Sequence, residues 1–137
     1  MKRAPLLLGV VAWLLAGAGT ADEPARESRG GGLSGEQAFL ACRPCHSLAP
    51  GAAHRVGPNL HGLMGAPAAT RTGYRYSGAL REAGLTWNEA TLTAWILQAE
   101  RMVPGTWMVY HNHLTHDEVQ RLVRYIADRA GAPAGGD

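Results

Sequence analysis

Residues 42–46 read Cys42-Arg43-Pro44-Cys45-His46 and hold the only two cysteines of the chain. A Cys-x-x-Cys pair is compatible with a tight disulfide, with thiol exchange or with metal binding, and the histidine that follows adds attachment of a larger prosthetic group. The choice among these chemistries depends on the compartment, on the surrounding fold and on further ligands elsewhere in the sequence.

Residues 1–21 have the order of a secretory signal peptide. Lys2 and Arg3 precede an apolar run over residues 6–15, and small residues lead to a cleavage site expected after Ala21. The run is short for a membrane span, which needs about 20 apolar residues, although an uncleaved N-terminal anchor stays open as an alternative. We expect a mature protein in the periplasm with no membrane span once the signal is cut. Because free thiols oxidise in that compartment, two lone cysteines need another use.

The chain is expected to contain one small domain. The predicted segments are a signal peptide (1–21), a flexible polar and Gly-rich leader (22–34), the domain itself (35–130) and a flexible tail (131–137). Of 13 basic and 11 acidic residues, Lys2 and Arg3 leave with the signal, so the mature chain is near neutral. It has no basic stripe of the kind that binds nucleic acid, and we expect no nucleic-acid partner.

The periodicity of apolar residues predicts three main helices, over residues 35–42, 87–98 and 115–130. The last begins with a capping-box pattern at Thr115. Residues 50–84 are dense in Gly and Pro and show no strand alternation. A loop that long is unusual in a small domain, and it is explained if the chain wraps a large prosthetic group. The predicted fold class is therefore all-α with long loops.

The surrounding sequence favours one of the chemistries open to the pentapeptide. Thiol exchange of the thioredoxin type expects the motif beside a βαβ unit, and no strands are predicted. Zinc needs four ligands; Cys42, Cys45 and His46 supply three, and the other histidines are not at a paired spacing familiar for zinc. Covalent attachment of haem uses every group, because two thiols become thioethers on the porphyrin and the imidazole turns under the iron. We therefore expect one haem c.

A second iron ligand is expected from a methionine. Met108 ends the stretch Pro104-Gly105-Thr106-Trp107-Met108, in which Pro fixes φ and Gly lets backbone approach a flat ligand closely. The loop is stiff and suits a weak thioether ligand. Met64 and Met102 have no such context, and we expect them to fill the core.

Several segments in unbroken order resemble the signatures of class I c-type cytochromes, close to mitochondrial cytochrome c and its soluble bacterial relatives. They are GEQAFLACRPCH, GPNLHGLMG, GYRYSGAL, GLTWNEATL, VPGTWM and LVRYI, within about residues 35–129. The resemblance implies a small all-α domain wrapped round one covalently bound haem that passes single electrons, and no enzymatic activity. It also implies that Gly35 and Phe39 cross Leu122 and Tyr125 where the first and last helices pack.

The same resemblance implies a role for individual residues. His46 is the proximal and Met108 the distal iron ligand, and the carbonyl of Pro58 accepts a hydrogen bond from the His46 ring. The haem propionates are expected to bond to Tyr76, Trp87 and Thr106. The expected cofactor-binding set is Cys42, Cys45, His46, Pro58, Tyr76, Trp87, Trp95, Thr106 and Met108, with His46 and Met108 on the metal.

The sequence departs from the family pattern at several places. Trp95, a hydrogen-bond donor only, stands where relatives commonly carry a Tyr that bonds the thioether sulfur. Ala66 stands where they commonly carry Arg, and Arg71 is a candidate to replace that charge. Trp107 occupies a place usually held by Lys beside the exposed haem edge, either as a docking contact or as a cover for the haem. We interpret residues 111–116 as a solvated turn that enters the last helix, and a metal site or an alternative haem ligand is the less favoured interpretation.

The function that the sequence favours is a periplasmic single-electron carrier, monomeric, with His and Met on the iron. Its partners would be redox proteins: a donor complex and a terminal oxidase, reductase or photosynthetic centre. One alternative is a dedicated electron-accepting subunit of one dehydrogenase. Another is a haem protein whose labile Met lets small ligands reach the iron.

The near-neutral charge leads to a first prediction. Relatives often use a ring of lysines to find acidic partners, whereas Lys2 is the only lysine here. Because long-range steering needs charge, we expect electron-transfer rates with partners to depend less on salt than in lysine-rich relatives. Stopped-flow rates over a salt series test this, and a steep fall in rate with added salt would contradict it.

Overall fold

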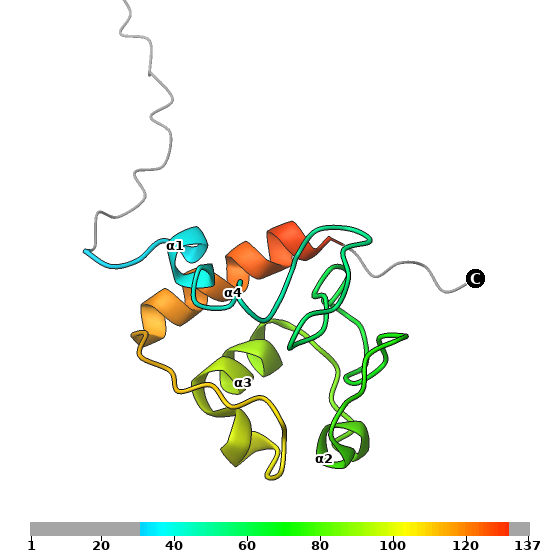
Figure 1. The fold of residues 1–137 in the computed structure, drawn as a ribbon. Helices are drawn as coiled ribbons and strands as arrows, with labels where there is room; N and C mark the ends of the chain where they lie inside the picture. Colours follow the sequence, from blue (N-terminus) through cyan, green and yellow to red (C-terminus); the bar gives the residue numbers. More distant parts are fainter. Residues whose placement is uncertain (1–30, 132–137) are drawn as a thin grey trace, which may run out of the picture. The chain divides into compact units, whose positions relative to one another are not determined.

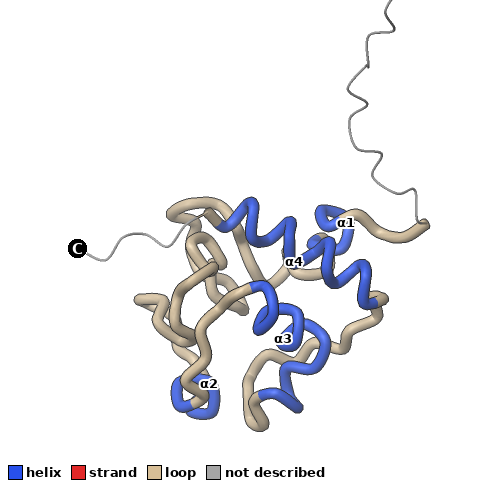
Figure 2. The backbone as a smooth tube through the Cα atoms, turned by 180° about the vertical axis from the view of Figure 1, so that it is seen from behind, coloured by secondary structure: helices blue, strands red, loops and turns tan. Residues whose placement is uncertain are grey.

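The computed structural model of the protein describes residues 31–131 (Figure 1). Within this range the chain forms four helices and no strand: α1 (Gly35–Phe39), α2 (Gly78–Glu82), α3 (Glu89–Met102) and α4 (His116–Ala130), joined by long loops (Figure 2). The all-α class predicted from the sequence is confirmed. The expected signal peptide (1–21) lies outside the described residues, as do the first part of the leader and the tail beyond residue 131.

Each of these helices has an N-cap residue whose side chain accepts a hydrogen bond from a backbone amide of the first turn. The capping box predicted at the start of α4 is present: the Thr115 hydroxyl accepts from the Glu118 amide at 3.3 Å, and the Glu118 carboxylate accepts from the Thr115 amide at 2.8 Å. Ser34 and Asn88 cap α1 and α3 in the same reciprocal way. Each box satisfies amides that the first turn leaves unpaired. No helix among residues 31–131 has the length and apolar character needed to cross a membrane.

The predicted helix bounds differ from the structure in three places. The first helix was expected over 35–42, but α1 ends at Phe39 and turns follow it. The second helix was expected over 87–98, but α3 runs from Glu89 to Met102 and passes a local break at Gln98, where φ is −156° and ψ is 61°. The expected loop over 50–84 contains α2, which the Ser77 hydroxyl caps by accepting from the Leu80 amide at 3.2 Å. A five-residue helix is shorter than the window over which apolar periodicity is read.

Helices α1 and α4 cross in close contact (Figure 1). The bare Cα of Gly35 lies against the Arg121 backbone and the Tyr125 side chain. The Phe39 and Tyr125 rings meet with centroids 5.7 Å apart, and Leu122 beneath them is fully buried. The crossing that the resemblance implied is therefore present.

The segment before α1 is also attached to α4. The Leu33 amide donates to the Glu118 carboxylate at 2.8 Å, and the Arg121 Nε–H donates to the Leu33 carbonyl at 2.8 Å. Leu33 and Ser34 fall within the stretch that the sequence placed in a flexible leader (22–34). In the structure these two residues form part of the α1–α4 contact.

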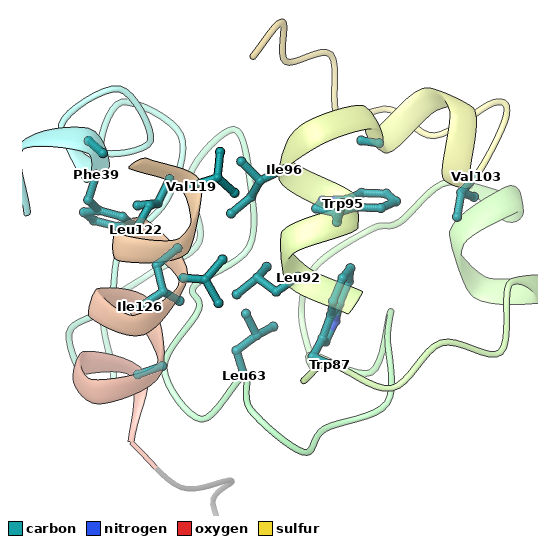
Figure 3. Packing of buried hydrophobic residues seen from close by; sticks show 14 of the residues in the cluster. Phe39, Leu63, Trp87, Leu92, Trp95, Ile96, Val103, Val119, Leu122 and Ile126 are labelled. Carbon is teal, nitrogen blue, oxygen red and sulfur yellow. The ribbon is translucent and has the colours of Figure 1, made fainter. Parts of the chain in front are cut away.

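The core lies between α3 and α4. Figure 3 shows Leu92 and Ile96 of α3 pointing toward α4, with Leu63 from the long loop beside them. Trp95 points away from α4, and its ring meets that of Trp87 edge-on at 5.4 Å between centroids. Leu92, Trp95 and Ile96 all belong to the core, and the same three side chains also line the space described below.

The α1–α4 crossing yields a stability prediction. A Cβ at position 35 would overlap the Arg121 carbonyl and come within 2.6 Å of the Tyr125 Cβ. We expect Gly35→Ala to lower the free energy of unfolding by about 1–3 kcal/mol, measured by urea denaturation, because the helices must move apart.

Gly78→Ala on α2 is the matched control, since no atom lies closer than 3.9 Å to its added Cβ. We expect this substitution to be neutral or stabilising by up to about 1 kcal/mol. Equal effects of the two substitutions would contradict the close crossing.

Candidate functional site

A cavity of about 450 Å³ lies beside α3, where Leu92, Trp95 and Ile96 line it. This volume is in the range of small-molecule and cofactor sites. Its walls are mostly apolar, and they come from the turn after α1, the loop over 50–84, α3 and the loop that precedes α4. All the residues expected to bind a cofactor line it: Cys42, Cys45, His46, Pro58, Tyr76, Trp87, Trp95, Thr106 and Met108.

Cys42 and Cys45 face the cavity because α1 continues as a series of tight turns. The Arg43 amide donates to the Phe39 carbonyl at 3.1 Å, and the His46 amide donates to the Cys42 carbonyl at 2.9 Å. Both cysteines are free thiols. Burial, and to a lesser degree the neighbouring Cys45, raises the pKa of Cys42 to about 11. A neutral thiol is a poor nucleophile, so Cys42 does not supply the activated thiolate that thiol exchange needs.

The imidazole of His46 is held in one orientation. Its Nδ1–H donates to the carbonyl oxygen of Pro58 at 2.8 Å, the contact that the resemblance implied. Burial lowers the pKa of His46, and the bond to the carbonyl opposes this shift. The ring is therefore neutral at pH 7, with the hydrogen on Nδ1 and a free lone pair on Nε2, the state in which imidazole binds metals.

Gly57 gives the His46 ring its place. A Cβ at position 57 would overlap the ring and lie 2.7 Å from both ring nitrogens. The Gly57 amide also donates to the Cys45 carbonyl at 2.9 Å, which ties this loop to the cysteine turn. The sequence alone predicted no role for Gly57. Its position directly before Pro58 was the available signal.

The thioether of Met108 contacts the Trp95 side chain of α3. The Trp95 Nε1–H donates to the Met108 sulfur at 2.9 Å. The Met108 amide donates weakly to the Thr106 hydroxyl at 3.4 Å, and Gly105 before them has φ of 86°. That value is in the left-handed region that glycine adopts without strain. Trp95 thus donates a hydrogen bond to the Met108 sulfur from the position where the family resemblance implies a Tyr.

The cavity wall carries several polar side chains. Tyr76, Trp87 and Thr106 line it, as does Arg71, which was not in the expected binding set. Burial raises the pKa of Tyr76, while the backbone amide and the positive charge of Arg71 act in the opposite direction. Among the described residues that line the cavity there is no Asp or Glu. The side chains of the wall therefore offer hydrogen-bond donors and positive charge without a carboxylate.

The rim of the cavity carries exposed apolar side chains. Trp107 is 57% exposed, Val109 81% and Val56 78%. The guanidinium of Arg75 lies 5.6 Å from the centroid of the Trp107 ring, a cation–π contact. No group of three or more His, Cys, Asp and Glu side chains in residues 31–131 is placed to hold a metal ion.

The chain matches no model of a known protein family, but it has similar relatives. It is 40% identical over 93 residues to cytochrome c2 of Blastochloris viridis, covering 68% of this chain and 73% of the relative. It is 37% identical over 100 residues to cytochrome c of Nigella damascena, covering 72% and 90%. Among solved structures it resembles cytochrome cH from Methylobacterium extorquens, with a TM-score of 0.62 and 38% identity over 67% of this chain and 92% of that one.

The place of the His46 ring yields a prediction. Gly57→Ala should push the imidazole away from the Pro58 carbonyl and lower the free energy of unfolding by about 1–3 kcal/mol. Urea denaturation measures the loss, and NMR of the Nδ1 hydrogen reports the broken bond. Gly31→Ala, whose Cβ would have no atom within 4 Å, is the control. An unchanged Nδ1 signal in Gly57→Ala would contradict the role of this glycine.

Proposed function

This chain belongs to the class I c-type cytochromes, and on that premise we propose that it carries single electrons in the periplasm through one haem c with His46 and Met108 on the iron. One observation supports this most strongly. A single cavity brings together two thiols, a neutral imidazole with a free Nε2 and a thioether sulfur. Covalent attachment and axial ligation of haem c need this set of groups.

The residues present fit a haem. The cavity has mostly apolar walls that suit the faces of a porphyrin, and the described lining residues include hydrogen-bond donors and two arginines but no Asp or Glu, which suits its carboxylates. The bare Cα of Gly57 leaves room for the imidazole that would coordinate the iron. When bound, the haem supplies an iron that changes reversibly between the ferric and ferrous states.

The protein's own residues would hold the haem and its iron ligands in place while the iron changes its oxidation state. Cys42 and Cys45 would prevent loss of the haem by covalent attachment. The Pro58 carbonyl would orient His46 and raise its basicity as an outer-shell partner. Trp95 would hold the Met108 sulfur in place. If His46 and Met108 both hold the iron, a substrate would have no place to bind it, which supports a carrier rather than an enzyme.

Electrons would enter and leave at the rim formed by Val56, Trp107 and Val109, where the cavity meets solvent. The partners would be redox proteins: a donor complex and an oxidase, reductase or photosynthetic centre. The periplasmic location rests on the signal-peptide pattern of residues 1–21. We propose that the protein works as a monomer.

The proposal predicts that haem is covalently attached and that its iron does not bind external ligands. A pyridine haemochrome assay on the mature protein should find one haem c per chain that acid–acetone does not extract. The reduced protein should not bind carbon monoxide at neutral pH, whereas Met108→Ala should bind it promptly, because the removed thioether opens the position. Met102→Ala is the control, since Met102 lies outside the cavity wall, and it should exclude carbon monoxide as the unsubstituted protein does.

The outcomes separate this proposal from its alternatives. Absence of covalent haem would overturn it. Prompt carbon monoxide binding by the unsubstituted protein would favour a haem protein with a labile Met, which the sequence left open. A dehydrogenase that co-purifies in a stable complex would favour a dedicated electron-accepting subunit.

A further inference from the structure

We propose that the guanidinium of Arg71 pairs with a carboxylate of the bound haem and thereby adjusts the reduction potential. The inference rests on the proposed function, because it takes haem as the occupant of the cavity. It adds to that function a residue that reaches the site from a different point of the chain than Ala66, where relatives commonly carry Arg.

The first observation is a half-buried charge without an acidic neighbour in the cavity. Arg71 is partly buried and lines the cavity wall, where the described residues include no Asp or Glu. Among residues 31–131 its guanidinium donates to the carbonyl oxygen of His61 and to no other group. A guanidinium has five N–H donors, and withdrawing its charge from water is costly unless an anion compensates it. Haem brings two carboxylates, which are its only anionic groups.

The second observation is the loop that delivers Arg71. Three backbone bonds fasten residues 65–68 to residues 85–87: Gly65 N–H to the Trp87 carbonyl at 2.7 Å, Trp87 N–H to the Ala66 carbonyl at 3.0 Å and Ala68 N–H to the Leu85 carbonyl at 2.8 Å. The chain then turns at Ala69, whose φ of 60° is uncommon for a residue with a Cβ. The Thr70 hydroxyl closes the turn by donating to the Pro67 carbonyl at 2.8 Å. The turn therefore holds Arg71 at the cavity before any ligand is bound.

The third observation is the set of other polar and charged groups in the cavity wall. Tyr76, Trp87 and Thr106 line the same cavity and carry hydroxyl or indole donors. The other charged side chain in the wall, Arg75, is exposed and stacks on the Trp107 ring. Arg71 is thus the guanidinium that solvent screens less, and a charge screened less has the larger effect on a nearby redox group.

The test compares midpoint reduction potentials of holoproteins. Arg71→Gln should lower the potential, because a lost positive charge favours ferric over ferrous iron. The ferric-to-ferrous ratio at a fixed ambient potential should rise on the order of tenfold. Arg71→Lys keeps the charge and should shift the ratio less. Arg75→Gln removes an exposed charge from the same loop and should change it by no more than about twofold.

A double variant separates charge from local structure. Ala66 also lines the cavity, so Ala66→Arg combined with Arg71→Gln returns a guanidinium to the wall from another position. We expect it to recover most of the potential. If Arg71→Gln alone yields no haem-bearing protein, recovery of covalent haem in the double variant supports the pairing, and failure to recover it overturns the pairing.

Other outcomes would also overturn the inference. One is a ferric-to-ferrous ratio in Arg71→Gln within twofold of that of the unsubstituted protein. Another is a shift in Arg71→Lys or in Arg75→Gln as large as the shift in Arg71→Gln. The haemochrome assay on the unsubstituted protein keeps these results distinct from failure of the proposed function. Covalent haem together with an unchanged reduction potential in Arg71→Gln would contradict the role of Arg71 and leave the proposed function intact.

Discussion

The hydrogen bond from the His46 Nδ1–H to the Pro58 carbonyl is the constraint on which the site depends. It fixes the tautomer of the ring and leaves Nε2 as a free lone pair. It also joins two segments without regular secondary structure, the cysteine turn and the part of the long loop that precedes α2. The loop can approach this closely only because Gly57 has no side chain, and the amide of that glycine adds a second bond to the Cys45 carbonyl. A local motif thus becomes one wall of a cavity.

The facing side of the site depends on a different donor. Trp95 is 5% exposed, its ring is held edge-on against Trp87, and its indole N–H points at the Met108 sulfur. An indole donates but does not accept, so Trp95 offers the sulfur a fixed donor and offers no acceptor to a neighbouring water or side chain. The large apolar ring belongs to the core and lines the cavity. Leu92 and Ile96 of the same helix do the same, and their side chains point toward α4 (Figure 3).

The sequence predicted the helices that have long apolar stripes or strong N-terminal caps. It did not predict the short helix or the exact ends of the others. Helix α4 begins at the predicted capping box because that signal lies within four adjacent residues. Helix α2 was missed because five residues show no period, and α3 was ended too early because the polar residues after Leu97 hide the buried Ala99 and Val103. The backbone of Leu33 is fastened by Glu118 and Arg121, which lie more than eighty positions away in the sequence and carry no local signal.

By itself the sequence determined the chemistry: two thiols and an imidazole in one pentapeptide, a thioether in a stiff loop, and a near-neutral mature chain. These are properties of residue types and short spacings, which need no coordinates. Only the tertiary structure decided which groups meet, because hydrogen bonds between distant segments depend on how the loops close. It brought Trp95 to the Met108 sulfur, set Gly57 against the His46 ring, and turned the chain at Ala69 so that Arg71 reaches a wall without acidic residues.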